Sequence, residues 1–361
     1  MSEIAYFSKD YAEARGKFRD AARHAGLQFE THANSATGPA DEELTTDVVW
    51  IGPHDASRLL IGLSGTHGAE TFSGSAIQTG WLTAQRFAKL PADTAVILIH
   101  ALNPYGFAWV RRVNEDNIDL NRNFIDHGAA YPDNPAYRQL RDAICPAEWT
   151  EESTVARDPT LAAYAAAHGA MALQSAITQG QYFDDEGVFY GGLAPCWSNR
   201  TLHAVLESHA GHVRSAAFID LHTGLGPYGY GEIISNHGAK SAGDARVRDW
   251  FGAEATSIDG GSSSAAISYG DTNIGVERAL PKTAVTGVTL EYGTVPVDEF
   301  MTAVRADNWL YIHGNPESAK GRAIKAQIRN AFFQDHDDWK KMIIDRSNDV
   351  LDRAMKGLTQ S

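Results

Sequence analysis

GTHGAE at residues 65–70 and IDLHTG at residues 219–224 each place a histidine at the end of an apolar run. The two runs, 59–63 and 216–221, have the length and composition of buried strands. In open α/β sheets, ligands and catalytic groups gather beyond the carboxyl ends of the strands. The two fragments therefore predict an α/β fold with a functional site where these strands end.

The residue types in the two fragments point to a metal. His67 and Glu70 are three positions apart, and His222 would supply the third ligand. Two imidazoles and one carboxylate leave the fourth zinc position open, as in a catalytic site, and we expect ligand distances of about 2.0–2.2 Å to a single zinc ion. An open zinc site indicates a hydrolase. The His-x-x-acid pair alone is weak, because 14 His and 45 acidic residues in 361 give roughly two such matches by chance.

Four further fragments strengthen this interpretation: NPYG at 103–106, RVN at 112–114, DLNRNF at 119–124 and LEY at 290–292. In order and approximate spacing, the set resembles the zinc carboxypeptidase family and its sister group, the aspartoacylase and succinylglutamate desuccinylase enzymes. The resemblance runs from about residue 59 to residue 292. It implies a three-layer α/β/α fold around a mixed, mostly parallel eight-stranded sheet.

The resemblance also implies roles for residues around the metal. Asp119 matches the carboxylate that holds the first zinc histidine, because a ligating imidazole donates its other N–H to such a group. Arg112 matches the arginine that stabilises the oxyanion of the transition state. Arg111 is the competing candidate for that role, and is otherwise expected to be a solvent-facing charge.

Substrate binding and proton transfer are assigned in the same way. Asn121 and Arg122 match the pair that grips a substrate carboxylate, for which a planar guanidinium offers two parallel donors. Glu291 ends an apolar run and matches the general base, which takes a proton from the attacking water and passes it to the leaving amine. Tyr269 matches, more weakly, a mobile tyrosine that closes over the substrate.

Some positions depart from the carboxypeptidase pattern. Tyr105 stands where many carboxypeptidases have an acidic residue, and the DLHTG context of His222 looks more like the deacylase sister group. The RVN fragment of Arg112 looks more like carboxypeptidases. These departures leave the metal and the reaction class intact, but they leave two substrate classes open.

The first hypothesis is therefore a zinc metallopeptidase of the carboxypeptidase kind, an exopeptidase that cleaves an amide bond next to a free carboxylate. The second is an N-acyl-amino-acid deacylase or amidase of the aspartoacylase type. The expected substrate is accordingly a small peptide or an N-acyl amino acid. A third hypothesis, a non-catalytic binding protein on the same scaffold, is disfavoured because the ligand and base positions are all filled.

Composition excludes other partners. The net charge is −14, and no Lys/Arg stripe with interleaved aromatic residues suggests nucleic-acid binding. The longest apolar stretches, such as 95–102, are too short to cross a bilayer. Two cysteines, and no basic and apolar signal over residues 1–9, favour a reducing compartment, and we expect a cytoplasmic protein. The sequence does not indicate an oligomeric state.

Hydrophobic periodicity predicts one catalytic domain over residues 1–361, with a helical tail at 317–361. A segment rich in glycine and aromatic residues, 179–200, is an insertion relative to the family. It is expected either as a lid or pocket wall, which would favour small substrates, or as a packed surface loop. The predicted strands include 46–51, 58–64 and 95–101, and the predicted helices include 11–26, 74–90, 161–177 and 335–356.

Overall fold

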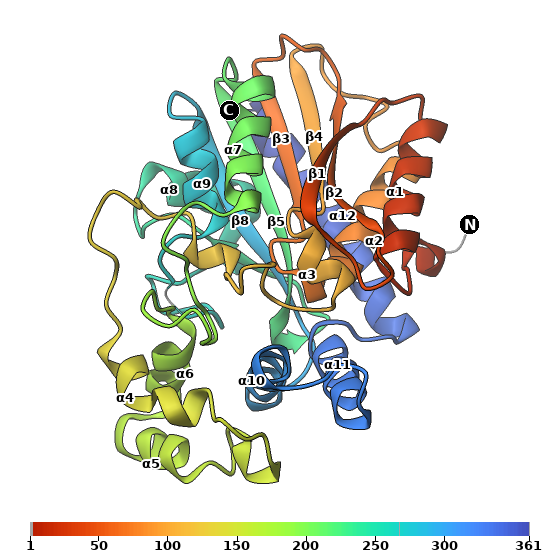
Figure 1. The fold of residues 1–361 in the computed structure, drawn as a ribbon. Coiled ribbons are helices and arrows are strands. Elements are labelled where there is room, and N and C mark those ends of the chain that lie inside the picture. The colour runs from red at the N-terminus through yellow and green to blue at the C-terminus, as the bar shows by residue number, and fades with distance from the viewer. Residues whose placement is uncertain (1–2, 267, 361) are drawn as a thin grey trace.

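The computed structural model describes residues 3–266 and 268–360, which form an eight-stranded sheet flanked by helices (Figure 1). Residues 1–2, 267 and 361 of the domain expected over 1–361 lie outside this description. The strands, in chain order, are β1 Glu30–Thr37, β2 Glu43–Ile51, β3 Arg58–Ser64, β4 Thr94–His100, β5 Ser215–Tyr228, β6 Glu232–Ser235, β7 Thr256–Ser257 and β8 Ala284–Gly293.

The strand order is β1-β2-β4-β3-β5-β8-β6-β7. The four central strands β4, β3, β5 and β8 are parallel to one another, whereas β2 and β6 run antiparallel to the central strands beside them. β1 pairs antiparallel with β2, and β7 pairs parallel with β6. The predicted mixed, mostly parallel eight-stranded sheet is therefore confirmed. Its central strands bring their carboxyl ends to one edge.

The central strands are apolar throughout because both faces of the sheet are covered. In β3, Leu60 packs into the core on one face while Leu59, Ile61 and Leu63 pack into the core on the other. The edge strand β1 was not predicted. Its sequence, ETHANSAT, is polar, and only one of its eight side chains is buried, so it carries no apolar signal.

Helices form a layer on each face, which confirms the predicted three-layer architecture. α1, α2, α8 and α12 pack on one face, and α7 and α9 pack on the other. All helix bounds are α1 Tyr11–His24, α2 Thr71–Thr83, α3 Pro104–Ala108, α4 Pro135–Ile144, α5 Pro159–His168, α6 Ala170–Thr178, α7 Trp197–Ala210, α8 Ala242–Phe251, α9 Thr272–Ala279, α10 Val297–His313, α11 Ala319–Phe332 and α12 Asp337–Gln360.

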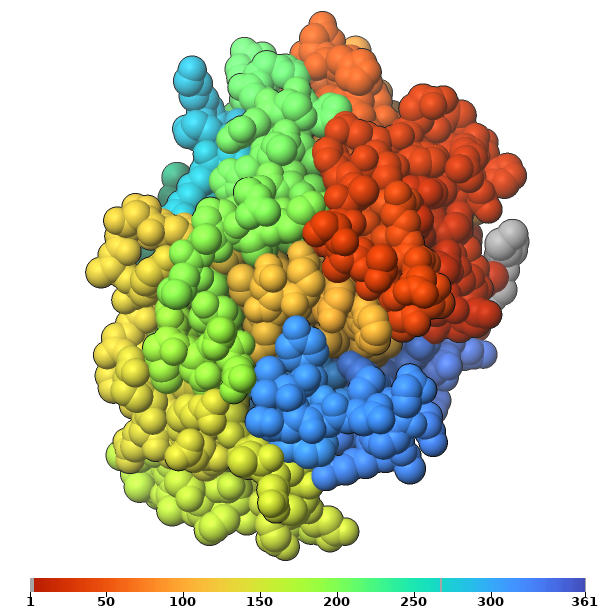
Figure 2. Space-filling view, in the orientation of Figure 1, coloured from red at the N-terminus to blue at the C-terminus, as the bar shows by residue number. Residues whose placement is uncertain are grey.

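Two groups of helices, α4–α6 and α10–α11, pack together through one apolar cluster beyond the sheet edge that carries the strand ends. Figure 2 shows them as the lower part of the surface in this view. The single helix predicted over 161–177 is wrong, because Gly169, at φ +93°, separates α5 from α6. The helix predicted over 74–90 ends at Thr83. Within the described residues, none of the helices is both long and apolar enough to span a bilayer.

Candidate metal centre and active site

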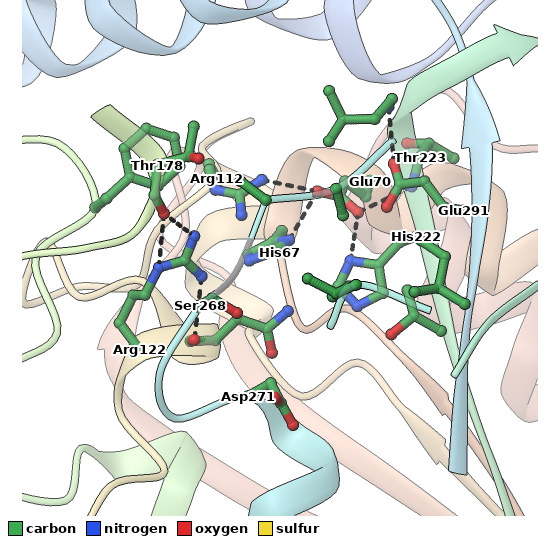
Figure 3. A pocket seen from close by; sticks show the side chains of 18 of the residues that line it. His67, Glu70, Arg112, Arg122, Thr178, His222, Thr223, Ser268, Asp271 and Glu291 are labelled. Atoms are coloured by element: carbon green, nitrogen blue, oxygen red, sulfur yellow. Dashed lines mark hydrogen bonds and ion pairs between the residues drawn. The ribbon is translucent and has the colours of Figure 1, made fainter. Parts of the chain in front are cut away.

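Three buried side chains meet just beyond the end of β3, beside the middle of its neighbour β5, so the expectation that His222 lies at a strand end is wrong. His67 precedes the short 3₁₀ turn Gly68–Glu70 that follows β3, Glu70 ends this turn, and His222 lies within β5, the parallel neighbour of β3. One ligand atom from each of the three lies within 4.8 Å of the other two (Figure 3). The structure thus brings together the three predicted ligands, which come from segments about 150 residues apart.

The ring orientations fit a cation. Nδ1 of His67 lies 2.8 Å from Oε1 of Glu70, and Nδ1 of His222 lies 3.0 Å from Oε2 of the same carboxylate. Two imidazole nitrogens therefore converge on one buried carboxylate, which is a donor set that zinc prefers. Burial opposes the charge of Glu70, but the two histidines hold its pKa well below the usual range. The triad is consistent with a single zinc ion.

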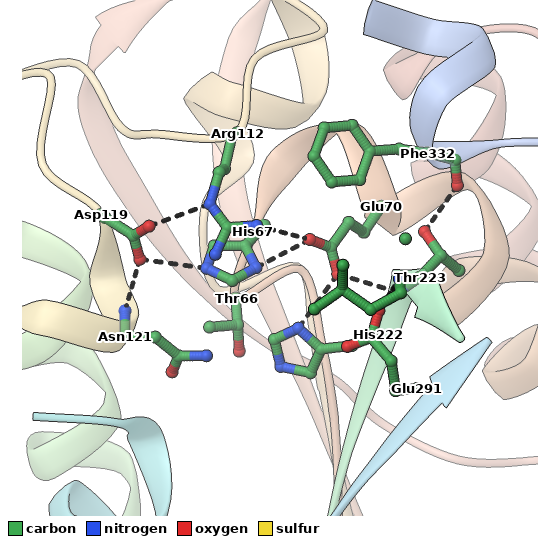
Figure 4. A network of polar contacts seen from close by, with 12 residues as sticks. Thr66, His67, Glu70, Arg112, Asp119, Asn121, His222, Thr223, Glu291 and Phe332 are labelled. Carbon is green, nitrogen blue, oxygen red and sulfur yellow. Dashed lines mark hydrogen bonds and ion pairs between the residues drawn. The ribbon is translucent and has the colours of Figure 1, made fainter. Parts of the chain in front are cut away.

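Asp119 lies behind His67, at the position that the sequence predicted. Its Oδ1 is 3.1 Å from Nε2 of His67, while its Oδ2 accepts a hydrogen bond of 2.9 Å from Nε of Arg112 (Figure 4). Burial raises the pKa of Asp119, but the guanidinium groups of Arg112 and Arg122 outweigh it and keep that pKa well below the ordinary value. The carboxylate is therefore charged, and it fixes the ring of His67 with Nδ1 towards the site.

Asp220 does for His222 what Asp119 does for His67, and the sequence analysis missed it. Its fully buried Oδ2 lies 2.8 Å from Nε2 of His222, although the angle is too poor for a hydrogen bond. Hydroxyl groups of Thr66 and Thr272 donate to the same carboxylate. The sequence did carry a signal for this contact. Asp220 and His222 are two residues apart on one strand, and such side chains lie on the same face of the sheet.

The turn that carries Glu70 docks closely against the segment that carries Arg112. A Cβ at Gly68 would lie 1.9 Å from the carbonyl carbon of Gly106, so only glycine fits there. The backbone N–H groups of Gly68 and Ala69 donate to the carbonyl oxygens of Arg112 and Arg111. This contact explains why the GTHGAE and NPYG fragments occur together.

Arg112, and not Arg111, lines the pocket. Nη1 of Arg112 donates to Oε1 of Glu70 at 3.3 Å. Arg111 points elsewhere: it pairs with Asp307 at 3.1 Å, and its guanidinium carbon lies 3.6 Å from the ring centroid of Tyr311. The expectation that Arg111 is otherwise solvent-facing is wrong, since its side chain is only 2% exposed. Arg111 therefore forms a buried ion pair with Asp307 outside the pocket lining.

Glu291 lies in β8 on the wall of the same pocket. Its Oε1 accepts a hydrogen bond of 2.9 Å from the backbone N–H of Leu225, which orients the carboxyl group. Burial, reinforced by the negative charge of Glu70, raises the pKa of Glu291 to about 8. A bound cation would lower the pKa of Glu291 and favour its ionised form.

Asn121 and Arg122 also line the pocket, and Arg122 lies on the side of His67 away from Glu291 (Figure 3). Arg122 is held by the main chain: Nε and Nη2 both donate to the carbonyl oxygen of Thr178, at the end of α6, and Nη1 donates to that of Asn121. The side-chain oxygen of Asn121 accepts from the N–H of Thr272 at 3.1 Å. Nη1 of Arg122 also lies 3.7 Å from Oδ1 of Asp119. Among the described residues, the amide NH₂ of Asn121 and one hydrogen on each terminal nitrogen of Arg122 make no hydrogen bond.

The segment 179–200 supplies part of the pocket wall. Phe189 lines the pocket, and its ring centroid lies 5.2 Å from the guanidinium carbon of Arg112 and 5.4 Å from that of Arg122. Tyr182 donates to the carbonyl oxygen of Arg122 at 2.6 Å. These contacts make the segment a packed wall in this structure, and its movement as a lid stays a prediction.

The pocket encloses about 720 Å³ of empty space, part of it open to solvent. Tyr269 does not line it in this structure, and its side chain is 44% exposed, so its role also stays a prediction. The sequence analysis missed several other lining residues, because single residues outside a motif carry no signal. These are Ile234, Asn236, Ile258, Ala265, Ala266, Ser268, Asp271, Thr289 and Phe300.

The chain belongs to the family described as "Protein of unknown function (DUF2817)", whose model matches residues 7–346. A comparison with curated proteins gave no match.

Solved structures with a similar arrangement include three enzymes. Carboxypeptidase A from Helicoverpa armigera is 11% identical, with 90% of this chain and 74% of that chain covered and a TM-score of 0.45. A Zn-dependent exopeptidase from Parabacteroides distasonis is 10% identical, with 98% and 94% covered and a TM-score of 0.40. A glutaminyl cyclase from Porphyromonas gingivalis is 9% identical, with 97% and 98% covered and a TM-score of 0.38. Similarities this distant assign no activity.

Proposed function

We propose that this protein is a zinc-dependent hydrolase that cleaves an amide bond next to a free carboxylate, in the manner of a metallocarboxypeptidase. The observation that carries the proposal is the convergence of His67, Glu70 and His222 beside the buried carboxyl group of Glu291 in one pocket. Ligands alone would suit a structural metal. Glu291 is a buried acid beside these ligands, it forms no ion pair with any described residue, and such a group suits proton transfer.

His67, Glu70 and His222 would hold the zinc ion, with Asp119 and Asp220 fixing the two rings from behind. When bound, zinc supplies a Lewis acid and lowers the pKa of a water molecule to near neutrality. The metal-binding groups are buried, so the field that they create is only weakly screened by solvent.

Glu291 is the general base in this proposal. Its carboxylate accepts a proton from the attacking water and later donates that proton to the leaving amine. The hydrogen bond from the N–H of Leu225 leaves Oε2 of Glu291 as the oxygen that exchanges the proton. Because Glu291 sits on a central strand, its position is fixed by sheet register and does not depend on a flexible loop.

Arg112 and Arg122 would each stabilise a different negative charge on the reacting substrate. Arg112 lies within hydrogen-bonding distance of the ligand Glu70, so its guanidinium is placed to stabilise the oxyanion of the transition state. Arg122 lies farther along the pocket (Figure 3), and with Asn121, which lines the same pocket, it holds the substrate carboxylate. The spacing between the two arginines then selects amides that have a carboxylate beside the scissile bond.

An N-acyl-amino-acid deacylase is the second candidate, and the wall at Phe189 favours it. This ring packs near both arginines and narrows the pocket on that side. A narrow pocket would accept a short acyl group or a single residue and exclude a long peptide.

Substrate pairs test both proposals. The zinc-loaded protein is assayed with N-acyl amino acids and with dipeptides, each as the free acid and as the C-terminal amide. We expect amidation to lower kcat/KM about thirtyfold or more, because it leaves the Arg122 guanidinium buried without its partner. Equal turnover of the two forms contradicts the role of Arg122. Efficient cleavage of long peptides contradicts the deacylase candidate.

A further inference from the structure

Thr272, the first residue of α9, connects this helix to two parts of the candidate site. Its backbone N–H is one of those that have no partner within the helix, and it donates to the side-chain oxygen of Asn121 at 3.1 Å. Its hydroxyl group donates to Oδ2 of Asp220 at 2.6 Å. Thr272 is only 1% exposed, so the protein encloses its hydroxyl group.

The hydroxyl contact of Thr272 is not part of the helix cap. Threonine hydroxyl groups at helix starts commonly bond to nearby backbone groups. In α9 the side chain of Asp271 already caps the helix, because it accepts from the backbone N–H of Ile274 at 3.2 Å. The hydroxyl group of Thr272 instead reaches a carboxylate on β5, 52 positions away in the sequence.

That carboxylate, Asp220, is the one behind the candidate ligand His222. Its Oδ2 accepts from Thr272 and also lies 2.8 Å from Nε2 of His222, so both contacts meet at one oxygen. The hydroxyl group of Thr66 lies 2.9 Å from Oδ1 of Asp220 and 3.0 Å from Oδ2. One hydroxyl hydrogen cannot satisfy two oxygens, so Thr272 is needed to hold Oδ2 in place.

The backbone contact of Thr272 concerns the proposed anchor for the substrate carboxylate. Because the side-chain oxygen of Asn121 accepts from Thr272, the amide NH₂ of Asn121 stays available to a ligand. This contact is made by the main chain, so it does not depend on which side chain stands at position 272. The two contacts can therefore be separated by substitution.

We propose that Thr272 is a positioning residue whose hydroxyl group orients His222 for the metal by holding Asp220. Groups behind a metal ligand fix its ring, and their loss commonly weakens metal binding about 10–100-fold. The proposal rests on the proposed function, because it takes His222 as a zinc ligand. It adds that zinc affinity depends on a side chain outside the pocket lining, at the start of a helix that also orients Asn121.

Zinc affinity tests this role without any substrate. Thr272→Val removes the hydroxyl group but keeps the shape of the side chain and the backbone N–H. In titrations of the metal-free protein against a competing chelator, we expect this variant to bind zinc about tenfold or more weakly than the wild type. Thr272→Ser retains a hydroxyl group and should bind zinc with nearly the affinity of the wild type.

Thr79→Val is the matched control for removing a buried hydroxyl group. Thr79 is a buried residue of α2 outside the pocket lining, and its hydroxyl group has no hydrogen-bond partner among the described residues. This variant should bind zinc as the wild type does. An equal loss of zinc affinity in Thr79→Val would show that any buried hydroxyl-to-methyl change has this effect.

A substrate comparison separates positioning of the metal ligand from a general displacement of α9. With saturating zinc, the preference for a free-acid substrate over its amide is measured as a ratio of kcat/KM values. Thr272→Val keeps the N–H that holds Asn121, so this ratio should equal that of the wild type. A displaced helix would lower the ratio together with the zinc affinity.

Three outcomes overturn the inference while the proposed function stands: unchanged zinc affinity in Thr272→Val, an equal loss in Thr272→Ser or Thr79→Val, or a lost preference for the free acid in Thr272→Val. A wild-type protein that binds no zinc contradicts the proposed function itself, and the inference falls with it.

Discussion

His222 and Glu291 are register partners on the neighbouring parallel strands β5 and β8. One is a candidate metal ligand and the other the candidate base, and they are far apart in the sequence. The backbone hydrogen bonds of the sheet hold them side by side, so neither position depends on a flexible loop. A metal bound by His222 would consequently lie close to the carboxyl group of Glu291.

Replacing either histidine ligand should remove the metal. We expect His67→Ala and His222→Ala to lose bound zinc and all turnover, because one imidazole and one carboxylate hold zinc weakly. His203→Ala, which lies outside the candidate site, serves as the control and should keep both. Zinc content measured by atomic emission decides the point, and a zinc-loaded His222→Ala protein would exclude this triad as the metal site.

Glu291→Gln should separate metal binding from catalysis. The variant keeps the shape of the side chain and the metal ligands but cannot accept a proton. We expect normal zinc content and a fall in kcat of about 10²–10⁴-fold, the range for a lost general base. Near-normal turnover by the zinc-loaded variant would remove Glu291 from the mechanism.

Asp119→Asn should weaken zinc binding without removing a ligand. The carboxylate holds the ring of His67 through Nε2, and partners of this kind contribute about 10–100-fold to metal affinity. Zinc titration against a competing chelator measures the change, with the exposed Asp126→Asn as the control. Unchanged affinity would show that Asp119 only balances the charge of the neighbouring arginines.

The two adjacent arginines should behave differently. Arg112→Ala should lower kcat about 10²–10³-fold through loss of oxyanion stabilisation. Arg111→Ala should instead lower the free energy of unfolding, by about 1–3 kcal/mol, because it removes one of the two cations that pair with the buried Asp307 and leaves Lys325 as the other. Denaturant unfolding and steady-state kinetics on both variants distinguish the roles, and the opposite pattern would reverse the assignment.

Stability and metal binding should depend on pH in a defined direction. Burial lowers the pKa of His222, but Asp220 and Glu70 outweigh it and raise that pKa well above 6.5, while Glu291 is raised from 4.5 to about 8. A raised pKa stabilises the folded state at low pH, and this contribution is lost as the pH rises through the folded value. The metal-free protein should therefore melt at a lower temperature at pH 8.5 than at pH 6.

The same two groups predict proton release when zinc binds. At pH 7 in the metal-free protein, His222 is a charged imidazolium and Glu291 is a neutral carboxylic acid. Zinc requires a neutral imidazole and favours an ionised carboxylate. Apparent zinc affinity should therefore rise with pH. Calorimetry in buffers of different ionisation enthalpy measures the number of protons released, and a value of zero would contradict the protonation states assigned here.

The sequence predicted the centre of this molecule well and its periphery poorly. Apolar strands that end in fixed motifs, such as GTHGAE, carry both the fold signal and the ligand positions. The polar edge strand β1 lacks such a signal because few of its side chains are buried. The break between α5 and α6 depends on the conformation of one glycine, Gly169, within an otherwise continuous helical pattern.

Residues that act singly were also beyond sequence reasoning. Asp271 is an isolated acid, and only the three-dimensional arrangement shows that it lines the pocket. The sequence favoured Arg112 over Arg111 only through the family resemblance, because adjacent residues in a loop follow no regular facing rule. The ion pair with Asp307, 196 positions away, is what turns Arg111 from the site.

The central claim is that one zinc ion is held by His67, Glu70 and His222. Anomalous diffraction at the zinc edge, from crystals of the protein grown with zinc, tests it most directly. The account predicts a single strong peak about 2.0–2.2 Å from Nδ1 of both histidines and from a carboxylate oxygen of Glu70. No peak among these three side chains, or a peak bound elsewhere in the chain, would contradict it.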